Sequence, residues 1–148
     1  SNGNPKAATF NGDISKWITS SVTNMVYTFQ MAAAFNSDIS KWITSSVTDM
    51  GSTFSRAAAF NSDISKWNTS SVTSMSHTFY GKTASFTGTG VDLWNINKVK
   101  DMTRIFGDLA LTSCNKRKIA DAWKSSAAFT KTPYDTDWAA DMCTVRFA

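Results

Sequence analysis

The chain contains few residues that could form a catalytic site. Its only histidine is His77, and its acidic residues are all Asp, of which Asp13, Asp38 and Asp63 recur in step with a repeat. Catalysis requires a nucleophile with a base, or an acid–base pair, within one pocket. Because the Asp residues follow the repeat, we expect them to accept hydrogen bonds from loop amides rather than to transfer protons. The sequence therefore predicts neither enzyme activity nor a cofactor.

The two cysteines, Cys114 and Cys143, both lie within the last 35 residues of the chain. Two thiols near one end, with none elsewhere, favour a single disulfide that stabilises the terminal segment. The alternative is a pair of small buried thiols in a reducing compartment. A zinc site is not expected, because His77 belongs to another part of the chain and no further ligands cluster near the cysteines.

A repeat of about 25 residues dominates the sequence. The segment 10–23 recurs almost unchanged at 35–48 and at 60–73, and each copy continues with a Met and, four residues later, a Phe. A fourth, degenerate copy begins at Phe86, and its extra residue lies in or near the Gly-rich segment 87–90. A loop tolerates such an insertion. The glycines there lack the Lys and Ser/Thr of a phosphate-binding loop.

Each repeat has two halves with different hydrophobic patterns. Residues 13–19 form a short segment with Ile14 and Trp17, bounded by turn-forming residues, which predicts a strand. Spacings of three and four predict one face of a short helix in the second half, from Val22, Met25, Phe29 and Ala33. Stacked copies would place the Trp residues in one column and the Phe residues in another. We therefore predict an α/β repeat solenoid, a right-handed coil like that of leucine-rich repeats, with short parallel strands, short helices and a C-terminal helical cap.

We expect the solenoid to span residues 1–106 and the cap residues 107–148. Residues 113–124 predict a helix, whose inward face would carry Ile119, Ala122 and Trp123. The basic run 116–118 is either a site for an anionic partner or a solvated outer face. No matching cap is visible at the N-terminal edge, and an open edge invites pairing. We expect further repeats or a partner to cover it.

The pattern of one repeat is Phe-Asn-x-Asp-Ile-Ser-x-Trp-x-Thr-Ser-Ser-Val-Thr-x-Met-x-x-x-Phe. Over residues 10 to about 106 this pattern resembles the BspA-type leucine-rich repeat, which occurs in bacterial surface lipoproteins and in microalgal proteins. The resemblance implies a solenoid with a surface or adhesion role, and it implies no catalytic residues. One departure concerns the position after each Trp, where the family often has Asp and this chain has Ile18, Ile43, Asn68 and Asn95.

The residues that flank the inward Ile and Trp of each repeat are the candidate partner-binding residues. They comprise a Lys column, a Thr column and an Ile pair: Lys16, Lys41 and Lys66; Thr19, Thr44 and Thr69; Ile18 and Ile43. Like charges one strand apart repel, so either salt or interleaved Asp offsets the Lys column, or the column binds an acidic protein or an anionic glycan. Exposed aliphatic residues beside basic ones suit a protein interface better than a phosphate backbone, so we expect no nucleic-acid partner.

Composition and pattern together favour a binding protein. The net charge of +4 is mild, and no apolar run approaches the ~20 residues that cross a membrane. We expect a non-enzymatic protein-interaction or surface-adhesion module that binds a partner through the strand face of the solenoid. The alternatives are a structural accessory subunit of a larger complex, including an organellar one, and an ice-binding protein, because regular Thr columns can order water. The expected location is extracellular or at the cell surface, or else the lumen of an oxidising organelle.

Overall fold

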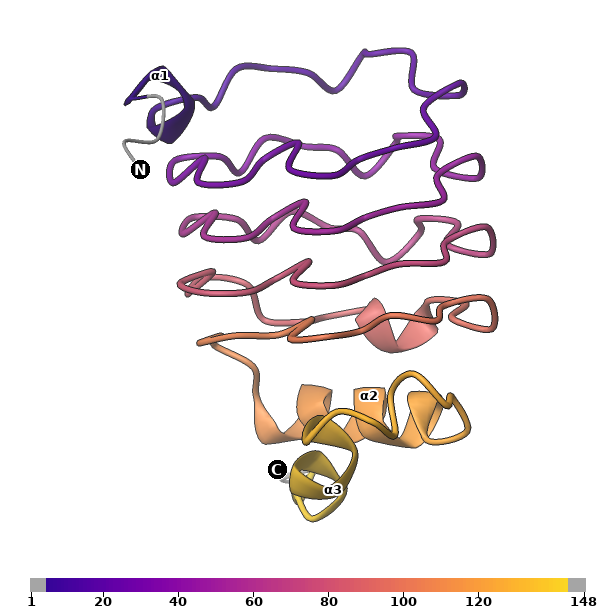
Figure 1. The fold of residues 1–148 in the computed structure, drawn as a ribbon. Helices are drawn as coiled ribbons and strands as arrows, with labels where there is room; N and C mark the ends of the chain where they lie inside the picture. Colours follow the sequence, from indigo (N-terminus) through magenta and orange to yellow (C-terminus); the bar gives the residue numbers. More distant parts are fainter. Residues whose placement is uncertain (1–4, 144–148) are drawn as a thin grey trace, which may run out of the picture.

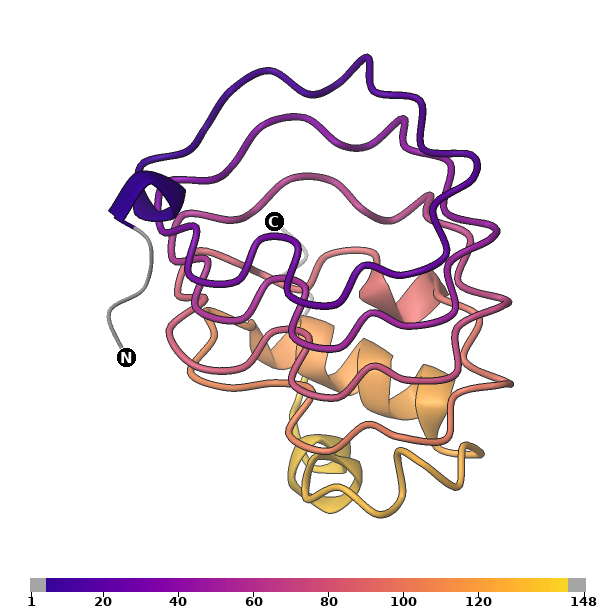
Figure 2. The same cartoon turned by 45° about the horizontal axis from the view of Figure 1, so that its top comes forward.

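A computed structural model describes residues 5–143 of the 148-residue chain. Within this range the chain winds through layers that are stacked one above another, one for each copy of the repeat (Figure 1). The helices are α1 (Pro5–Ala8), the 3-10 helix η1 (Val91–Leu93), α2 (Ser113–Trp123) and α3 (Tyr134–Ala139). Helix α1 lies at one end of the stack, and α2 and α3 lie at the other (Figures 1 and 2). None of these helices is long and apolar enough to cross a membrane.

The predicted α/β repeat solenoid, with the strands and helices of a leucine-rich repeat, is wrong. Between residues 5 and 143 the chain forms no named strand and no sheet. Neighbouring layers meet in isolated parallel bridges, such as those that join Asn24 to Asp49 and Asp49 to Ser74. The helices predicted within the first three copies are absent as well, and turns fill the layers instead.

Local turns replace the strand that was predicted at residues 13–19. The Oδ1 atom of Asp13 accepts the backbone N–H of Ser15 at 2.9 Å, and the N–H of Trp17 donates to the carbonyl of Ile14 at 3.1 Å. An Asp side chain that bonds the backbone two residues on competes with a ladder between strands. Both bonds recur in the second and third copies. The turn is therefore a property of the repeat, and its amides are not free to build a strand.

Left-handed residues interrupt the helix that was predicted in the second half of each repeat. Tyr27 and Met31 have φ values of 62° and 60°, and the equivalent Ser52 and Arg56 have 54° and 59°. Residues with positive φ cannot continue a right-handed helix. The spacing of three and four residues instead arises from a run of turns, in which amides such as that of Thr28 donate to the carbonyl three residues before them.

The core consists of aromatic columns that run through the stack. The predicted Trp and Phe columns are confirmed, and the Phe that begins each repeat forms a third column. Neighbouring ring centroids within these columns lie 5.5 to 6.4 Å apart: Trp17–Trp42–Trp67–Trp94, Phe29–Phe54–Phe79–Phe106 and Phe10–Phe35–Phe60–Phe86. One small residue was assigned incorrectly, because Ala32 is buried and Ala33 is exposed. Each layer thus depends on its neighbours to bury its rings.

The C-terminal segment closes the last layer. The predicted helix forms as α2, and its N-cap is Thr112, whose Oγ1 accepts the N–H of Asn115 at 3.1 Å. Trp123 of α2 and Trp138 of α3 lie 6.1 and 4.9 Å from the ring of Phe106, the last residue of the Phe column. The inward face of α2 includes Ala120 in place of the predicted Ala122, which is exposed. The cap therefore gives the fourth layer the apolar neighbour that a fifth repeat would provide.

Candidate functional site

Five of the predicted partner-binding residues lie on the surface of the stack. Lys16, Lys41 and Lys66 are exposed, and the exposed fractions of Ile18 and Ile43 are 93% and 54%. In the first three layers the Lys lies in the turn that the Asp side chain stabilises, and in the first two an Ile follows two residues later. We call these five residues the Lys–Ile ridge.

The ridge position that follows each Trp differs between the two halves of the stack. In the third and fourth layers it holds Asn68 and Asn95, whose Oδ1 atoms accept the backbone N–H two residues on at 3.0 and 3.1 Å. This side-chain bond stabilises a turn. The first two layers hold Ile18 and Ile43, which cannot make the bond and lie in solvent. Two layers thus lack a turn-stabilising hydrogen bond and expose an aliphatic side chain in its place.

Carboxylates accompany the Lys column. Asp13, Asp38 and Asp63 lie three residues before the three Lys residues and are exposed. Hydrogen bonds from the Ser two residues on, through its side chain and its backbone, hold the pKa of each carboxyl below its usual value, and the neighbouring Lys adds a smaller effect in the same direction. The three carboxylates are therefore charged at neutral pH and offset the Lys charges. The Lys column therefore lies in a surface of mixed charge.

The predicted Thr column is not part of this surface. Thr19, Thr44 and Thr69 have exposed fractions of 6%, 3% and 1%. Their hydroxyls donate to backbone carbonyls of the next layer at 2.9 to 3.1 Å, and the Oγ1 of Thr19 also accepts the N–H of Ile43 at 2.8 Å. A buried hydroxyl requires such partners. The prediction that these Thr residues contact a partner is wrong, and this column is not available to order water.

A further set of buried Thr residues was missed at the sequence level. The hydroxyl of Thr53 lies 3.0 Å from the carbonyl of Met25 in the preceding layer and 2.7 Å from that of Met50 in its own. Thr78 repeats the arrangement one layer later. A Thr recurs between the Met and the Phe of the first three copies, and that recurrence was the available signal. These hydroxyls hold layers together and do not reach a ligand.

The basic run in the cap is partly used for internal contacts. Arg117 donates from Nε to Oδ2 of Asp121 at 2.8 Å and from Nη1 to the carbonyl of Ala139. The first contact lies along α2 and the second reaches the end of α3. Because Arg117 is engaged in this way, the run fits a solvated outer face better than a site for an anionic partner.

Cys114 and Cys143 form a disulfide, the pairing that the sequence favours, with their Cα atoms 4.3 Å apart. The bond joins the first turn of α2 to the segment that follows α3, across a sequence separation of 29. Neither of the two cysteines is therefore a free thiol. The disulfide closes the cap upon itself and does not contact the Lys–Ile ridge.

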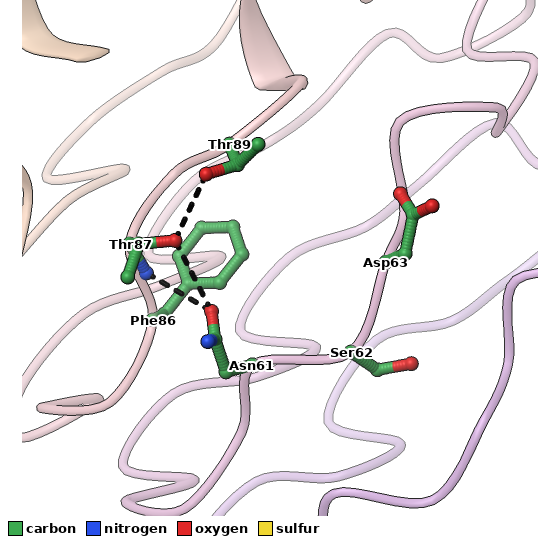
Figure 3. Close-up of a pocket in the computed structure, with 6 residues that line it drawn as sticks. All are labelled: Asn61, Ser62, Asp63, Phe86, Thr87 and Thr89. Atoms are coloured by element: carbon green, nitrogen blue, oxygen red, sulfur yellow. Dashed lines mark hydrogen bonds between the residues drawn. The ribbon is translucent and has the colours of Figure 1, made fainter. Parts of the chain in front are cut away.

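One shallow hollow lies beside the loop of the fourth copy (Figure 3). Its lining consists of Asn61, Ser62, Asp63, Phe86, Thr87 and Thr89. The Oδ1 of Asn61 accepts both the N–H and the hydroxyl of Thr87, at 3.2 and 3.3 Å, and the latter hydroxyl lies 3.0 Å from that of Thr89. The equivalent Asn of each earlier layer also accepts an N–H from the layer below. These bonds therefore connect layers, and the lining contains no His, Lys or Cys that could act on a substrate.

His77 lies away from this hollow. Its ring packs edge-on against Tyr80 with the centroids 5.1 Å apart, and the residue is half-buried. The backbone N–H of His77 donates to the carbonyl of Thr103 at 2.9 Å. Hydrogen bonds from Thr103 are the main cause of the lowered pKa of Asp101, and the charge of His77 contributes less. In the part of the chain that the structure describes, no three His, Cys, Asp or Glu side chains group so as to hold a metal ion.

The sequence of the layered region matches a known protein family. Residues 3–126 match the model of the family described as Mycoplasma protein of unknown function, DUF285. The chain belongs to this family. The DUF285 match includes all four copies of the repeat and helix α2, and its description assigns no activity. It does not identify the chain as a BspA-type leucine-rich repeat protein. No curated protein and no solved structure matches the chain.

Proposed function

We propose that this DUF285 protein is a non-enzymatic interaction module that binds a protein partner through the Lys–Ile ridge. The observation that carries the proposal is the presence of Ile18 and Ile43 where the other two layers have Asn. In those layers the Asn stabilises its turn, whereas Ile18 and Ile43 make no such bond and are 93% and 54% exposed. A partner that buries the two side chains would supply about 1.5–3 kcal/mol of binding free energy from Ile18 and about half as much from Ile43, which is already partly buried.

The charges of the ridge support a specific geometry for the partner. Lys and Asp residues alternate along the exposed turns, so a complementary protein surface would pair with both signs and be held in one register. An anionic glycan would be attracted by the Lys residues and repelled by the neighbouring carboxylates. A protein with two apolar side chains flanked by mixed charges is the partner that fits this surface.

The disulfide supports an extracellular, cell-surface or oxidising-lumen location, since disulfides persist in such compartments. The resemblance of the repeats to BspA-type surface proteins supports the same location and an adhesion role. The alternative of a structural subunit of a larger complex differs in one measurable respect. A subunit migrates with its complex in native extracts, whereas a species that migrates alone argues for a separate module.

The test uses a matched pair of substitutions. The double variant Ile18→Asn/Ile43→Asn gives the first two layers the residue that the other two already carry, so we expect it to fold normally. Met142→Asn is the control, because Met142 is 73% exposed and lies on the cap. Partners retained from native extracts are identified by quantitative mass spectrometry, and the affinity of the purified partner is then measured by calorimetry.

We expect the double variant to lose the partner and the Met142 variant to keep it. Substituting Lys16, Lys41 and Lys66 by Ser is expected to weaken binding further and to change its dependence on salt. A partner that the double variant binds as tightly as the native chain would show that the ridge is not the binding surface. Thermal hysteresis of the purified protein would instead indicate the ice-binding alternative.

A further inference from the structure

The first layer of the stack ends in an uncovered face. Trp17 is 61% exposed and Phe10 is 38% exposed, whereas the equivalent residues of the later layers are buried at 8% or less. Together with Ala7, Phe29 and Ala32 they line a mostly apolar crevice. The face lies at the end of the stack opposite α2 and α3 (Figure 1). It is distinct from the Lys–Ile ridge, which runs along the side of the layers.

Along residues 25–31 and their equivalents, the backbone hydrogen bonds between layers have one direction. In the first layer the N–H groups of alternate residues donate to carbonyls of the second layer at 2.8 to 3.1 Å; these residues are Met25, Tyr27, Phe29 and Met31. The second layer donates to the third in the same way, from Met50, Ser52, Phe54 and Arg56. This stretch of each layer therefore offers its N–H donors towards the C-terminal end and its carbonyl acceptors towards the N-terminal end. Bonds elsewhere in the layer, such as that from the N–H of Thr48 to the carbonyl of Thr23, run the other way.

The end face consequently presents a row of acceptors. The carbonyls of Asn24, Val26 and Thr28 correspond to those of Asp49, Gly51 and Thr53, which accept these bonds one layer later. In the described part of the chain no hydrogen bond reaches the three carbonyls of the first layer. Their spacing of two residues matches the spacing of the donors on the far side of each layer. The row thus has the register of a contact between layers.

The Trp side chains also form hydrogen bonds between layers. The indole Nε1 of Trp42 donates to the carbonyl of Ile14 in the preceding layer at 3.1 Å, and Trp67 and Trp94 make the equivalent bond. The Nε1 of Trp17 faces the end of the stack without such a carbonyl among the described residues. Its ring is also stacked on one side only, against Trp42 at 6.2 Å. On the side that faces the N-terminal end, Trp17 therefore lacks the indole hydrogen bond and the stacked Trp ring that Trp42, Trp67 and Trp94 each have.

One corner of the face is already occupied in the manner of a preceding layer. The N–H of Ala34 donates to the carbonyl of Ala8 at 3.0 Å, as the N–H of Ala59 donates to that of Ala33 in the next layer. Ala8 thus takes the place that the end of a preceding repeat would have. The face lacks the rest of such a layer, which would lie over Trp17 and along the row of carbonyls.

We propose that the end face binds a repeat segment of the same type, supplied by another polypeptide. Alternate N–H groups of that segment donate to the carbonyls of Asn24, Val26 and Thr28, its Trp ring stacks on Trp17, and its Phe ring stacks on Phe10. A second copy of this chain does not fit, because the side of its layers that carries the alternate N–H groups is covered by α2 and α3, and the same stretch of its own end face offers carbonyls.

The probe is a synthetic peptide with the sequence of residues 35–54, which stops short of the place that Ala8 occupies. The peptide is labelled with fluorescein and titrated with the intact chain, and binding is followed by anisotropy. We expect saturable binding, with a shift of the Trp17 indole N–H resonance, which is assigned by its absence in Trp17→Phe. A peptide that is N-methylated at Met50 and Phe54 lacks two of the donors and is expected to bind about tenfold more weakly or worse.

Two variants of the chain test whether the peptide binds at the end face. Trp17→Ala is expected to weaken the peptide about tenfold or more, while the ridge variant Ile18→Asn/Ile43→Asn binds it normally. This control keeps the failure of one proposal separate from the failure of the other. Equal binding of the native and the N-methylated peptide would overturn the proposal, as would a dimer of the chain that Trp17→Ala abolishes, since the occupant would then be a second copy.

A tethered version excludes weak folding of the free peptide as an explanation for a negative result. The same segment is joined to the N-terminus through a Gly/Ser linker, which raises its effective concentration to about the millimolar range. We expect the tethered segment to protect Trp17 from acrylamide quenching and to raise the unfolding midpoint above that of a tethered scrambled sequence. Identical quenching and identical midpoints for the two tethered chains would refute the proposal.

Discussion

The two ends of the stack carry the same repeat residues in opposite surroundings. At the C-terminal end Phe106 is 1% exposed, beneath Trp123, Tyr134 and Trp138 of the cap. At the N-terminal end Trp17 projects into solvent, although its copies are buried. The fourth copy is degenerate but keeps the Trp of this position, and its Trp94 is only 4% exposed. The difference shows that a neighbouring layer or cap, rather than the residues of a layer, determines whether that layer is closed.

The contacts that stabilise the fold and the surfaces proposed to bind partners lie towards opposite ends of the stack. The C-terminal end has helices, a disulfide and a hydrogen bond of 2.6 Å from the hydroxyl of Tyr134 to the carbonyl of Phe106. Burial raises the pKa of that hydroxyl, so it stays protonated and can donate throughout the neutral range. Of the seven large apolar residues that are exposed in the described part of the chain, five lie in the first two layers, at Phe10, Trp17, Ile18, Tyr27 and Ile43, and the others are Leu93 and Met142. Both proposed binding surfaces lie in this N-terminal half.

The largest effect is expected from emptying the Trp column at two points. Trp67→Ala removes a ring that is 4% exposed and stacked on both sides, and it should reduce the free energy of unfolding by about 3–5 kcal/mol. Trp17→Ala removes the same ring from the open end and should cost about 1 kcal/mol. Urea denaturation measures both. Equal losses would mean that the open end is covered in solution.

The second prediction concerns the disulfide that stabilises the cap at the C-terminal end. The loop of about 30 residues that it closes predicts a loss of about 3–4 kcal/mol in Cys114→Ser/Cys143→Ser. Denaturation of the native protein with and without reductant provides the matched control, since reduction should reproduce the variant. An unchanged midpoint would show that the aromatic contacts alone hold the cap in place.

A smaller loss is expected from a single buried hydroxyl between layers. Thr69→Val leaves the carbonyl of Asn95 without its 2.9 Å partner and should cost about 1–2 kcal/mol. Thr73→Val is the control, because Thr73 makes a similar bond to Thr48 at the exposed surface, where water can replace it. The difference between the two midpoints measures what burial adds. Two equal losses would place both hydroxyls in the same environment.

The smallest effect concerns acid. The folded-state pKa of Asp13, Asp38 and Asp63 lies below the ordinary 3.8, so the unfolded chain takes up protons first as the pH falls. Their contribution to stability is therefore complete above about pH 4 and is lost as the pH falls through the lower folded values. In the triple Asp→Asn variant the amide oxygen can still accept the Ser N–H but does not titrate. Its unfolding midpoint should depend less on pH below 4 than that of the native chain, and an equal dependence would assign the acid sensitivity to other groups.

The sequence predicted the parts of the fold that depend on repetition. Identical residues at identical spacing must occupy equivalent places, so the Trp and Phe columns, and the cap that ends them, could be inferred before the structure. The pairing of Cys114 with Cys143 was favoured because the chain has no other cysteine. The secondary structure could not be inferred in this way. The spacing of Val22, Met25 and Phe29 fits a helix and a run of turns equally well, and hydrophobic periodicity does not reveal the positive φ at Tyr27.

By itself, the sequence determined which residues are equivalent, because a 25-residue period leaves no other register. Only the tertiary structure decided which of these residues reach the surface. Thr19 and Ile18 are adjacent in the chain, yet the hydroxyl is buried against the carbonyl of Ile43 and the aliphatic side chain lies in water. The physical reason is that a polar group can be buried wherever a neighbouring layer supplies its partner. That partner comes from 24 residues away, and no local pattern shows it.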